Sequence, residues 1–359
     1  MKEVIQLTQD LVRIKSVYTD MDEIKRCADF IQSYLADCGA EFQRLEFEGI
    51  PSFLVMPKID TVPVVLMSHF DVVPGGDALF EPKIEAGKLF GRGALDDKYA
   101  VAISLVLLKS FLQELRENGL DQNHLPFGLL ITGDEESGGM NGAKKALALI
   151  KTRFCIALDG GGLDQLIIKE KGIARIKLVA DGIPAHSARP WLGDNAIDKL
   201  IDDYARLKEF FISSTPDRWH RTINFSRIEG GKAGNQVPDY AEALFDIRFT
   251  ENDDIDALFK EMQKAIKGRL ELLWKEPLFM ATQSPYLDLL IENNAQIKVG
   301  SEHGSSDARF LSVFGINGVV WGADGDRSHH SDQEHVNIDS VLHLQENLNR
   351  YLRQVSQIT

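Results

Sequence analysis

The residues from 127 to 158, FGLLITGDEESGGMNGAKKALALIKTRFCIAL, consist of two apolar runs separated by a more polar segment. The apolar runs at 127–132 and 154–158 predict buried strands, and the spacing of residues 142–150 predicts a helix between them. A strand, a helix and a second strand in succession are typical of a largely parallel sheet wrapped by helices. This stretch therefore predicts an α/β fold.

The segments on either side of this stretch have the same character. Turn residues separate short apolar runs, and helical patterns occur near both ends of the chain. The expected helices span residues 4–14, 22–38, 99–115, 286–297 and 340–357, and the expected strands span 41–47, 52–56, 62–67 and 318–321. Residues 1–171 and 283–359 are therefore expected to form one domain around a mixed, largely parallel sheet.

Residues 172–282 have a different pattern, in which polar and apolar residues roughly alternate. This alternation at 174–181 and 240–249 predicts half-exposed strands of a smaller sheet. Further strands are expected at 222–228 and 269–274, with helices at 196–211 and 255–267. These elements predict an inserted α+β domain whose helices cover one face of its sheet.

The composition argues against several classes of function. A chain of 359 residues with 44% hydrophobic residues can bury a sizeable core, and its length favours two domains. A formal charge of −14 without a lysine or arginine cluster opposes binding to nucleic acid and to anionic membranes. Cys27, Cys38 and Cys155 form no CxxC pair, which argues against a disulfide framework or a thiolate zinc site. Because no transmembrane stretch or apolar signal sequence is apparent, the expected location is the cytoplasm.

Two adjacent carboxylates, Glu135 and Glu136, occupy a glycine-rich turn after the expected strand 127–132. Neighbouring side chains in such a turn can point in different directions. One carboxylate could therefore bind a cation while the other moves a proton. The alternative is an acidic turn that is merely exposed to solvent.

Five more candidate residues also have ordinary structural interpretations. His69 follows an expected strand, and the nearby Asp71 could fix its tautomer, although both could be surface residues. Asp96 lies where a glycine-rich loop enters a helix, which it could simply cap. Asp159 precedes three glycines and could be a turn residue. His330 lies in a late loop, where a histidine is usually solvated.

The shared location of these residues is more informative than any one of them. Both glutamates, His69, Asp96 and Asp159 fall at the carboxyl ends of expected strands or in the loops that follow, where open α/β sheets bind ligands. With His330 they offer two imidazoles, three carboxylates and one spare glutamate. Nitrogen and oxygen ligands without thiolate suit zinc, cobalt or manganese, with zinc as the default. A carboxylate shared by two cations would make a two-metal hydrolase site.

Seven short motifs, in this order, resemble those of one enzyme family. They are SHFD at 68–71, GRGALD at 91–96, TGDEESGG at 132–139, AHS at 185–187, GNQVPD at 234–239, SDAR at 306–309 and HSDQE at 330–334. The family is the co-catalytic zinc aminoacylases and exopeptidases, including acetylornithine deacetylase, succinyl-diaminopimelate desuccinylase, peptidase T, carnosinase and the glutamate carboxypeptidases. The resemblance covers nearly the full length. It implies a zinc-exopeptidase-like α/β fold, with the insertion as a ferredoxin-like lid and dimerisation domain.

The resemblance implies a site for two divalent metal ions per chain, zinc by default, with cobalt or manganese possible. The implied ligands are Asp96 for both ions, His69 and Asp159 for one ion, and Glu136 and His330 for the other. His329 is an alternative to His330. We prefer His330 because its spacing to Glu334 fits the family motif.

The resemblance also assigns roles to two carboxylates outside the ligand set. Asp71 would support His69. Glu135 would be the general base that takes a proton from the metal-bridging water and delivers it to the leaving amine. In the family the peptide bond after the bridging aspartate is often cis, which here is the bond from Asp96 to Asp97.

The inserted domain is expected to contribute to substrate binding. By resemblance, His186 would donate to the oxyanion of the tetrahedral intermediate, often from a partner subunit, so a homodimer through the inserted domain is expected. Asn235 resembles a residue that helps to bind the substrate near that point. Arg248 and Arg309 are candidate anchors for a substrate carboxylate, with a structural ion pair as the alternative.

Two departures from the family pattern concern the pocket. Tyr99 follows Lys98 where the family usually has glycine. Three glycines follow Asp159 where many members have a proline-containing sequence. Both changes could reshape the pocket.

The sequence therefore predicts a metal-dependent hydrolase that cleaves an amide bond of a small N-acyl amino acid or a short peptide. The alternative is a catalytically silent family member that binds a small ligand or serves as an interaction module. Loss of Glu135 or of a metal ligand would distinguish such a member, and neither is lost.

Overall fold

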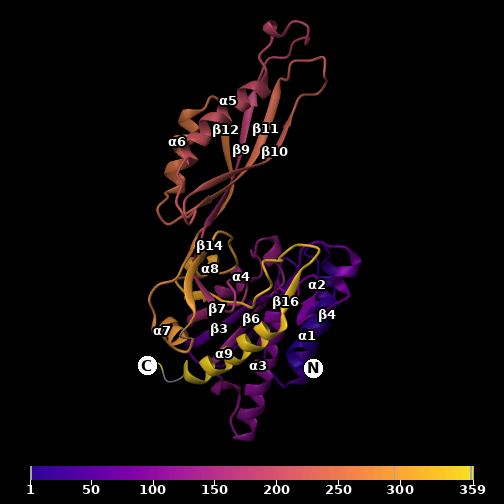
Figure 1. Cartoon of the computed structure of the whole chain (residues 1–359), viewed down its shortest axis with the longest axis vertical. Helices are drawn as coiled ribbons and strands as arrows, with labels where there is room; N and C mark the ends of the chain where they lie inside the picture. The colour runs from indigo at the N-terminus through magenta and orange to yellow at the C-terminus, as the bar shows by residue number, and fades with distance from the viewer. Residues whose placement is uncertain (1, 295, 356–357, 359) are drawn as a thin grey trace. The chain divides into compact units, whose positions relative to one another are not determined.

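The structure is a computed structural model that describes residues 2–294, 296–355 and 358. The chain divides into two compact units (Figure 1). The first comprises Met1–Lys169, Met280–Glu302 and Ser306–Thr359, and the second comprises Glu170–Phe279 and His303–Ser305. The role of the second unit as a lid and dimerisation domain stays a prediction.

The first unit is built on a mixed sheet with the strand order β1-β2-β6-β3-β7-β15-β8-β13, in which β14 also pairs with β8. Its centre is parallel, since β3 pairs in parallel with β6 and β7, and β15 with β7. Antiparallel strands flank this centre. The strands are β1 Gln43–Phe47, β2 Ile50–Val55, β3 Val62–His69, β6 Phe127–Thr132, β7 Thr152–Ala157, β8 Gln165–Glu170, β13 Phe279–Met280, β14 Lys298–Glu302 and β15 Asn317–Val320.

The central strands explain why the apolar runs are continuous. Every residue of β6 is buried, as are all residues of β3 except Pro63. Strands that are covered by helices on both faces read as unbroken apolar runs. The predicted largely parallel α/β sheet is therefore confirmed.

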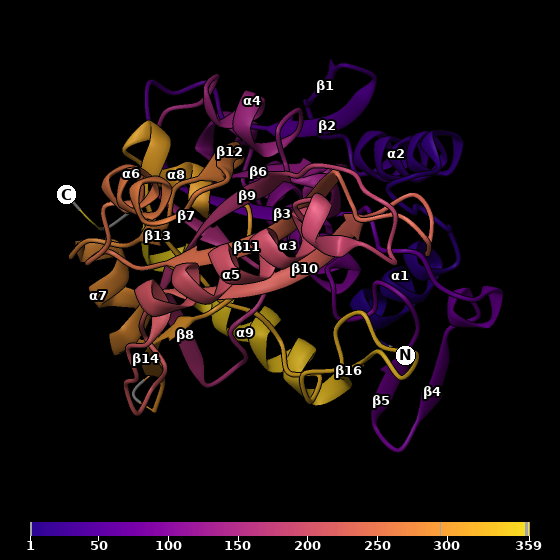
Figure 2. The ribbon, with the colours of Figure 1, turned by 90° about the horizontal axis from the view of Figure 1, so that it is seen from above.

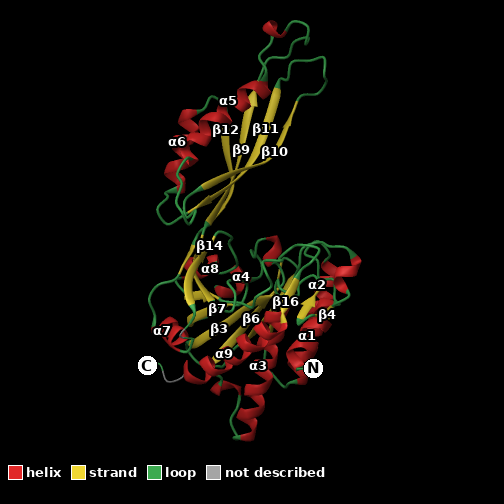
Figure 3. Ribbon diagram, viewed as in Figure 1, coloured by secondary structure: helices red, strands yellow, loops and turns green. Residues whose placement is uncertain are grey.

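Helices pack on the sheet of the first unit (Figure 3). Helices α1, α3 and α9 share one apolar core with β3 through residues that include Leu66, Leu105 and Leu348. Helices α4 and α8 pack on β6 and β15, respectively. The helices are α1 Glu3–Val12, α2 Met21–Asp37, α3 Lys98–Glu117, α4 Ala143–Leu147, α7 Pro285–Glu292, α8 Arg309–Phe314 and α9 Ile338–Gln354.

Most of the predicted helices differ in length from those observed, as three examples show. The helix expected at 142–150 is confined to α4, Ala143–Leu147. The helix expected at 286–297 corresponds to α7, and residue 295 lies outside the described residues. The helix expected at 340–357 begins two residues earlier as α9, and residues 356–357 also lie outside the described part of the chain.

A small sheet that the sequence did not predict joins two loops of the site. It has the order β16-β5-β4, with β4 Lys83–Glu85, β5 Lys88–Phe90 and β16 His335–Asn337. Figure 2 shows β4 and β5 as a hairpin. Antiparallel pairing of β5 with β16 places His335 opposite Phe90. The loop that follows β5 is thereby brought next to the loop that precedes β16.

The second unit is an α+β layer. Its antiparallel sheet has the order β10-β11-β9-β12, with β9 Gly172–Asp181, β10 Thr222–Gly230, β11 Tyr240–Phe249 and β12 Arg269–Glu276. Helices α5 Ala196–Lys208 and α6 Ile255–Ala265 bury Leu200 and Met262 against alternate residues of β9 and β11. This period of two is the pattern that predicted half-exposed strands.

Short 3₁₀ helices complete the secondary structure. They are Asp77–Phe80, Gln122–His124, Glu135–Ser137, Pro190–Leu192 and Glu209–Phe211. Across the residues that the structure describes, no helix combines the length and apolar character needed to cross a membrane.

Candidate metal centre

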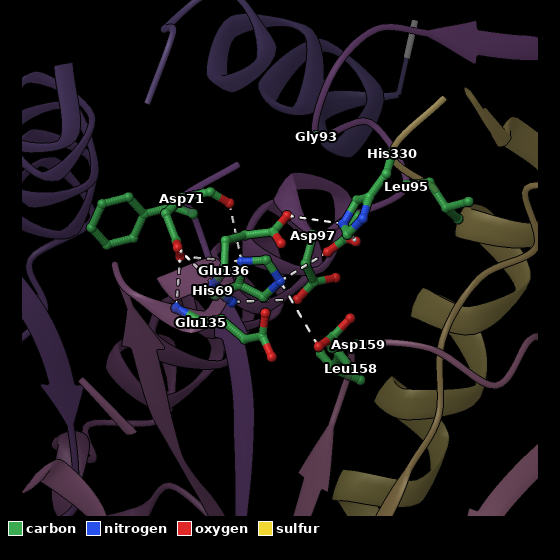
Figure 4. Close-up of polar contacts among 12 residues, drawn as sticks. His69, Asp71, Gly93, Leu95, Asp97, Glu135, Glu136, Leu158, Asp159 and His330 are labelled. Carbon is green, nitrogen blue, oxygen red and sulfur yellow. Dashed lines mark hydrogen bonds and ion pairs between the residues drawn. The ribbon is translucent and has the colours of Figure 1, made fainter. Parts of the chain in front are cut away.

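The predicted ligands come together at the carboxyl-end edge of the parallel strands. His69 is the last residue of β3, and Thr132, its register partner, is the last residue of β6. The short helix Glu135–Ser137 follows β6, and Asp159 follows β7. Figure 4 shows the side chains of His69, Glu136, Asp159 and His330 pointing toward a common centre.

Two groups of potential metal ligands share Asp96. His69, Asp96 and Asp159 form one group, Asp96, Glu136 and His330 form the other, and within each group the ligand atoms lie within 4.8 Å of one another. His69 Nε2 lies 3.0 Å from Asp96 Oδ1 and 3.9 Å from Asp159 Oδ2. His330 Nε2 lies 3.0 Å from Asp96 Oδ2 and 3.2 Å from Glu136 Oε1. Each oxygen of Asp96 therefore faces a different imidazole, as a bridging carboxylate requires.

The donor set fits two divalent cations. Each group combines one imidazole with carboxylates and contains no thiolate, which suits zinc, cobalt or manganese. Burial raises the pKa of Glu136 and of Asp159 to about 6 in each case, and the neighbouring Asp96 adds to both shifts. Three carboxylates gathered at low exposure are costly without cations to offset their charge.

The surrounding carboxylates favour a positive charge on both imidazoles. Burial opposes charge on His69, but the carboxylates of Asp71 and Asp96 raise its pKa well above the ordinary value. Hydrogen bonding to Asp96 and Glu136 raises the pKa of His330 to about 10. Although burial alone would raise the pKa of Asp96, His330 and His69 hold it below the usual range. These shifts show that the centre favours positive charge, as the binding of divalent cations requires.

Asp71 organises both sides of the centre. Its carboxylate lies 3.3 Å from His69 Nδ1, whose nearest acceptor is the Asp71 carbonyl at 3.1 Å. This leaves Nε2 of His69 directed at the ligand group. The two carboxylate oxygens of Asp71 also accept from the backbone N–H groups of Glu135, at 3.1 Å, and Glu136, at 2.9 Å. The sequence predicted the contact of Asp71 with His69. It did not predict the contacts with the N–H groups of Glu135 and Glu136, which depend on the fold of the glutamate turn.

Glu135 belongs to neither ligand group. Its carboxylate lines a small cavity with Ser68, His69, Asp159 and Asp307. Burial raises the pKa of Glu135 well above its ordinary value, and the negative charges of Asp159 and Asp307 add to the shift. A partly buried carboxylate beside the predicted ligands with a raised pKa is suited to accept and release a proton.

Glu334 and Arg92 form a clamp that the sequence did not reveal. Oε1 of Glu334 accepts from the N–H groups of Gly93, Leu95 and Asp96, at 2.8, 3.2 and 3.3 Å. Arg92 forms a buried ion pair with Glu334 and donates to the carbonyl of His330 at 3.2 Å. The clamp therefore joins the loop of the shared aspartate to the loop of the last histidine. The peptide bond between Asp96 and Asp97 is cis, as the resemblance predicted.

The two adjacent histidines differ in their surroundings. His330, whose φ of 61° lies in the left-handed region, contributes to the second ligand group. His329 belongs to neither group among the described residues.

The remaining predicted residues lie in both units. In the second unit, an isolated bridge pairs His186 with Gln236, and the N–H of Ser187 donates to the carbonyl of Asn235 at 3.0 Å, so His186 and Asn235 lie on adjacent backbone segments. Arg248, on β11, donates from Nε to Asp246 at 2.7 Å. Arg309 lies in the first unit and is buried.

Comparison with known proteins now gives the family. Residues 65–354 match the model of peptidase family M20/M25/M40. The chain belongs to this family. A similar relative is the succinyl-diaminopimelate desuccinylase of Magnetococcus marinus, which is 27% identical over 361 residues covering 93% of each chain.

Solved structures show the same fold. A tripeptidase from Staphylococcus aureus has a TM-score of 0.83 and 21% identity, with 99% of this chain and 98% of that chain covered. A dinuclear metal-binding M20 peptidase from Bacillus subtilis has a TM-score of 0.68 and 14% identity, with 99% and 98% covered. The mixed α/β architecture is therefore that of the M20 structures.

Family membership and the two ligand groups make this chain a metal-dependent hydrolase that acts on amide bonds. No observation supports the alternative of a silent member, because every predicted ligand and Glu135 are present in the centre.

Tyr99, which stands where the family usually has glycine, contacts two backbone segments. Tyr99 is fully buried, donates its hydroxyl to the carbonyl of Leu158 at 2.6 Å and accepts from the N–H of Ala323 at 3.0 Å. It therefore binds the backbone just before Asp159. After Asp159, Gly160, Gly161 and Gly162 all have positive φ values, which favour glycine.

Proposed function

We propose that the chain hydrolyses the amide bond of a small N-acyl amino acid or short peptide at a two-metal centre, with Glu135 as general base. The observation that carries the proposal is that Asp96 shares its two oxygens between two ligand groups while Glu135 lies beside them as a spare, partly buried carboxylate. The desuccinylase relatives favour an N-succinyl amino acid as the first substrate to test.

Each of the two metal ions would have its own set of ligands, with Asp96 in both. His69, Asp96 and Asp159 would hold one metal ion, and Asp96, Glu136 and His330 would hold the other. When bound, two such ions lower the pKa of a water molecule and polarise the carbonyl of the scissile bond. Zinc is the proposed metal, with cobalt or manganese as alternatives.

The proton transfer belongs to Glu135. Its carboxylate would accept a proton from the attacking water and return it to the departing amine. The amide N–H of Glu135 is bound by Asp71, which also faces His69, so one residue fixes the base relative to a ligand. Positioning of this kind supplies a large part of the catalysis in enzymes.

The second unit is proposed to complete the substrate site. His186 would donate to the oxyanion, Asn235 would bind the substrate next to it, and Arg248 would anchor a carboxylate. The adjacent backbone segments of His186 and Asn235 support a shared task. In the proposed homodimer through the second unit, these residues serve the partner's centre. The cytoplasmic location also stays a prediction.

The test is a substrate screen with the purified chain loaded with zinc or with cobalt. N-succinyl, N-acetyl and N-formyl amino acids and unblocked dipeptides are compared, and the Glu135→Gln variant serves as the control. We expect hydrolysis of at least one class, loss of this activity in Glu135→Gln, and about two metal ions per chain. A folded chain that takes up no metal at neutral pH would reject the proposal.

A further inference from the structure

We infer that Arg309, paired with Asp307, is a positioning residue that holds the turn carrying Glu135, and that it does not bind substrate. This inference rests on the proposed role of Glu135 as general base. The sequence offered two interpretations of Arg309, an anchor for a substrate carboxylate and a member of a structural ion pair. The inference replaces the first and extends the second.

Both terminal nitrogens of Arg309 donate to backbone carbonyl groups. Arg309 is the first residue of α8, and only 3% of its side chain is exposed. Nη1 donates to the carbonyl of Ser306 at 2.6 Å, and Nη2 donates to the carbonyl of Gly138 at 2.8 Å. Gly138 is the residue that ends the short helix Glu135–Ser137, with a φ of 107°. The guanidinium group therefore holds the carboxyl end of the element that carries the base.

The charge of Arg309 lies near the carboxylates of Glu135, which is partly buried, and Asp307, which is buried. Nη1 is 3.8 Å from Glu135 Oε1, and Nη2 is 3.5 Å from Asp307 Oδ1. Neither distance is a hydrogen bond of ordinary length, so the guanidinium acts on Glu135 through its charge and leaves the carboxylate free to accept a proton. The Arg309 guanidinium also lies 4.4 Å from the centre of the Phe310 ring, which restricts its movement.

Asp307 packs directly on the same turn. A Cβ added to Gly139 would lie 2.0 Å from Asp307 Oδ1 and 2.8 Å from Phe310 Cε2, and Gly139 has a φ of 63°. No residue other than glycine would fit there without movement of the backbone. The segment from Asp307 to Phe310 is thus fitted against the turn at Gly139, next to the contact of Arg309 with Gly138.

The two ends of the turn are held by different residues. Asp71 binds the N–H groups of Glu135 and Glu136, whereas Arg309 binds the carbonyl of Gly138. Loss of Arg309 should therefore release the end beyond Glu136 and remove the charge that lies 3.8 Å from Glu135 Oε1, while Asp71 still holds the backbone N–H of the proposed metal ligand Glu136. We therefore expect that loss of Arg309 lowers the turnover rate and leaves metal binding unchanged.

Three variants test the inference: Arg309→Met, Arg309→Lys and, as a matched control at an exposed arginine, Arg13→Met. Each is measured for bound zinc, for kcat and KM on an N-acyl amino acid, and for kcat and KM on the same compound with its carboxylate converted to an amide. We expect Arg309→Met to keep both zinc ions and to lose about 100-fold in kcat on both substrates, as for a misplaced catalytic group. Arg309→Lys keeps the charge and should recover part of kcat, and Arg13→Met should match the wild type.

Hydrogen exchange supplies a readout that does not depend on activity. In the metal-free and zinc-loaded protein, Arg309→Met should speed exchange of the amides from Ser137 to Gly139 and leave those of Glu135 and Glu136 nearly unchanged. If Arg309→Met does not fold, Arg309→Lys carries the same comparison.

Three results would overturn the inference. They are a rise in KM confined to the substrate with the free carboxylate, a loss of bound zinc, and exchange equal to that of the wild type. Failure of the proposed function would look different, because the wild-type chain itself would then hydrolyse none of the amides.

Discussion

Asp96 is the single residue on which both ligand groups depend. Each of its oxygens lies 3.0 Å from a different imidazole nitrogen. Glu135 and Glu136 are adjacent in the sequence, but their carboxylates have different surroundings. Glu136 faces His330 at 3.2 Å, whereas Glu135 turns to the cavity that Asp307 lines. Chemically identical groups can therefore take different tasks.

The first prediction separates these two glutamates. Glu135→Gln should lower kcat by about 10² to 10⁴-fold, the usual contribution of a general base, while both metal ions stay bound. Glu136→Gln should lower the metal content, because it removes a charged ligand from one group. Steady-state kinetics and elemental analysis of both variants make the comparison. Equal metal loss in the two variants would contradict the division of roles.

The second prediction concerns Tyr99. Tyr99→Phe removes a hydroxyl that binds two backbone groups, at Leu158 and Ala323, in a fully buried position. Leaving these groups without a partner should lower the free energy of unfolding by about 1–3 kcal/mol. Calorimetry of the metal-free protein measures the shift.

Tyr240→Phe is the matched control for that experiment. Tyr240 is 40% exposed, and its hydroxyl donates to Glu242 at the surface. Its loss should change stability by no more than about 0.5 kcal/mol. If both variants melt like the wild type, Tyr99 does not hold the backbone before Asp159.

At the scale of elements, the sequence placed the predicted ligands at strand ends but did not predict the elements that connect their loops. His69 and Asp159 were predictable because each follows a continuous apolar run, and the parallel sheet brings such ends together. Strands β5 and β16 have three residues each and pair Phe90 with His335 across the length of the chain. Three residues show no periodicity, so neither the strands nor the contacts of Glu334 could be inferred from the sequence.

The third prediction tests this connection. Glu334→Ala removes the acceptor for the N–H groups of Gly93, Leu95 and Asp96, and the partner of Arg92. It should weaken metal binding by about 10- to 100-fold, the usual cost of losing a residue that supports a ligand. Glu334→Gln keeps an acceptor and should have a smaller effect. Titration of the metal-free protein with zinc against a competing chelator gives the affinities.

Asp332→Asn is the control for the Glu334 variants, because Asp332 lies in the same loop and is exposed. Its zinc affinity should equal that of the wild type. An unchanged affinity in folded Glu334→Ala would show that the aspartate loop keeps its position without the clamp.

At the scale of the whole molecule, the predicted site residues divide between the two units. The ligand groups, Glu135 and Arg309 belong to the first unit, and His186, Asn235 and Arg248 belong to the second. The first unit thus contains the complete proposed metal centre. A metal centre could receive these residues from the second unit of its own chain or of the partner chain. An experiment can distinguish the two arrangements.

The fourth prediction is that two inactive variants restore each other in a homodimer. His186→Ala lacks the proposed oxyanion donor, and Glu135→Gln lacks the base. If His186 serves the partner's centre, a mixed dimer contains one centre with an intact Glu135 and an intact His186. Equal mixing should then recover about one quarter of the wild-type activity, because half of the dimers are mixed and each has one complete centre. If His186 serves its own chain, every centre lacks one group and purified mixed dimers should stay inactive.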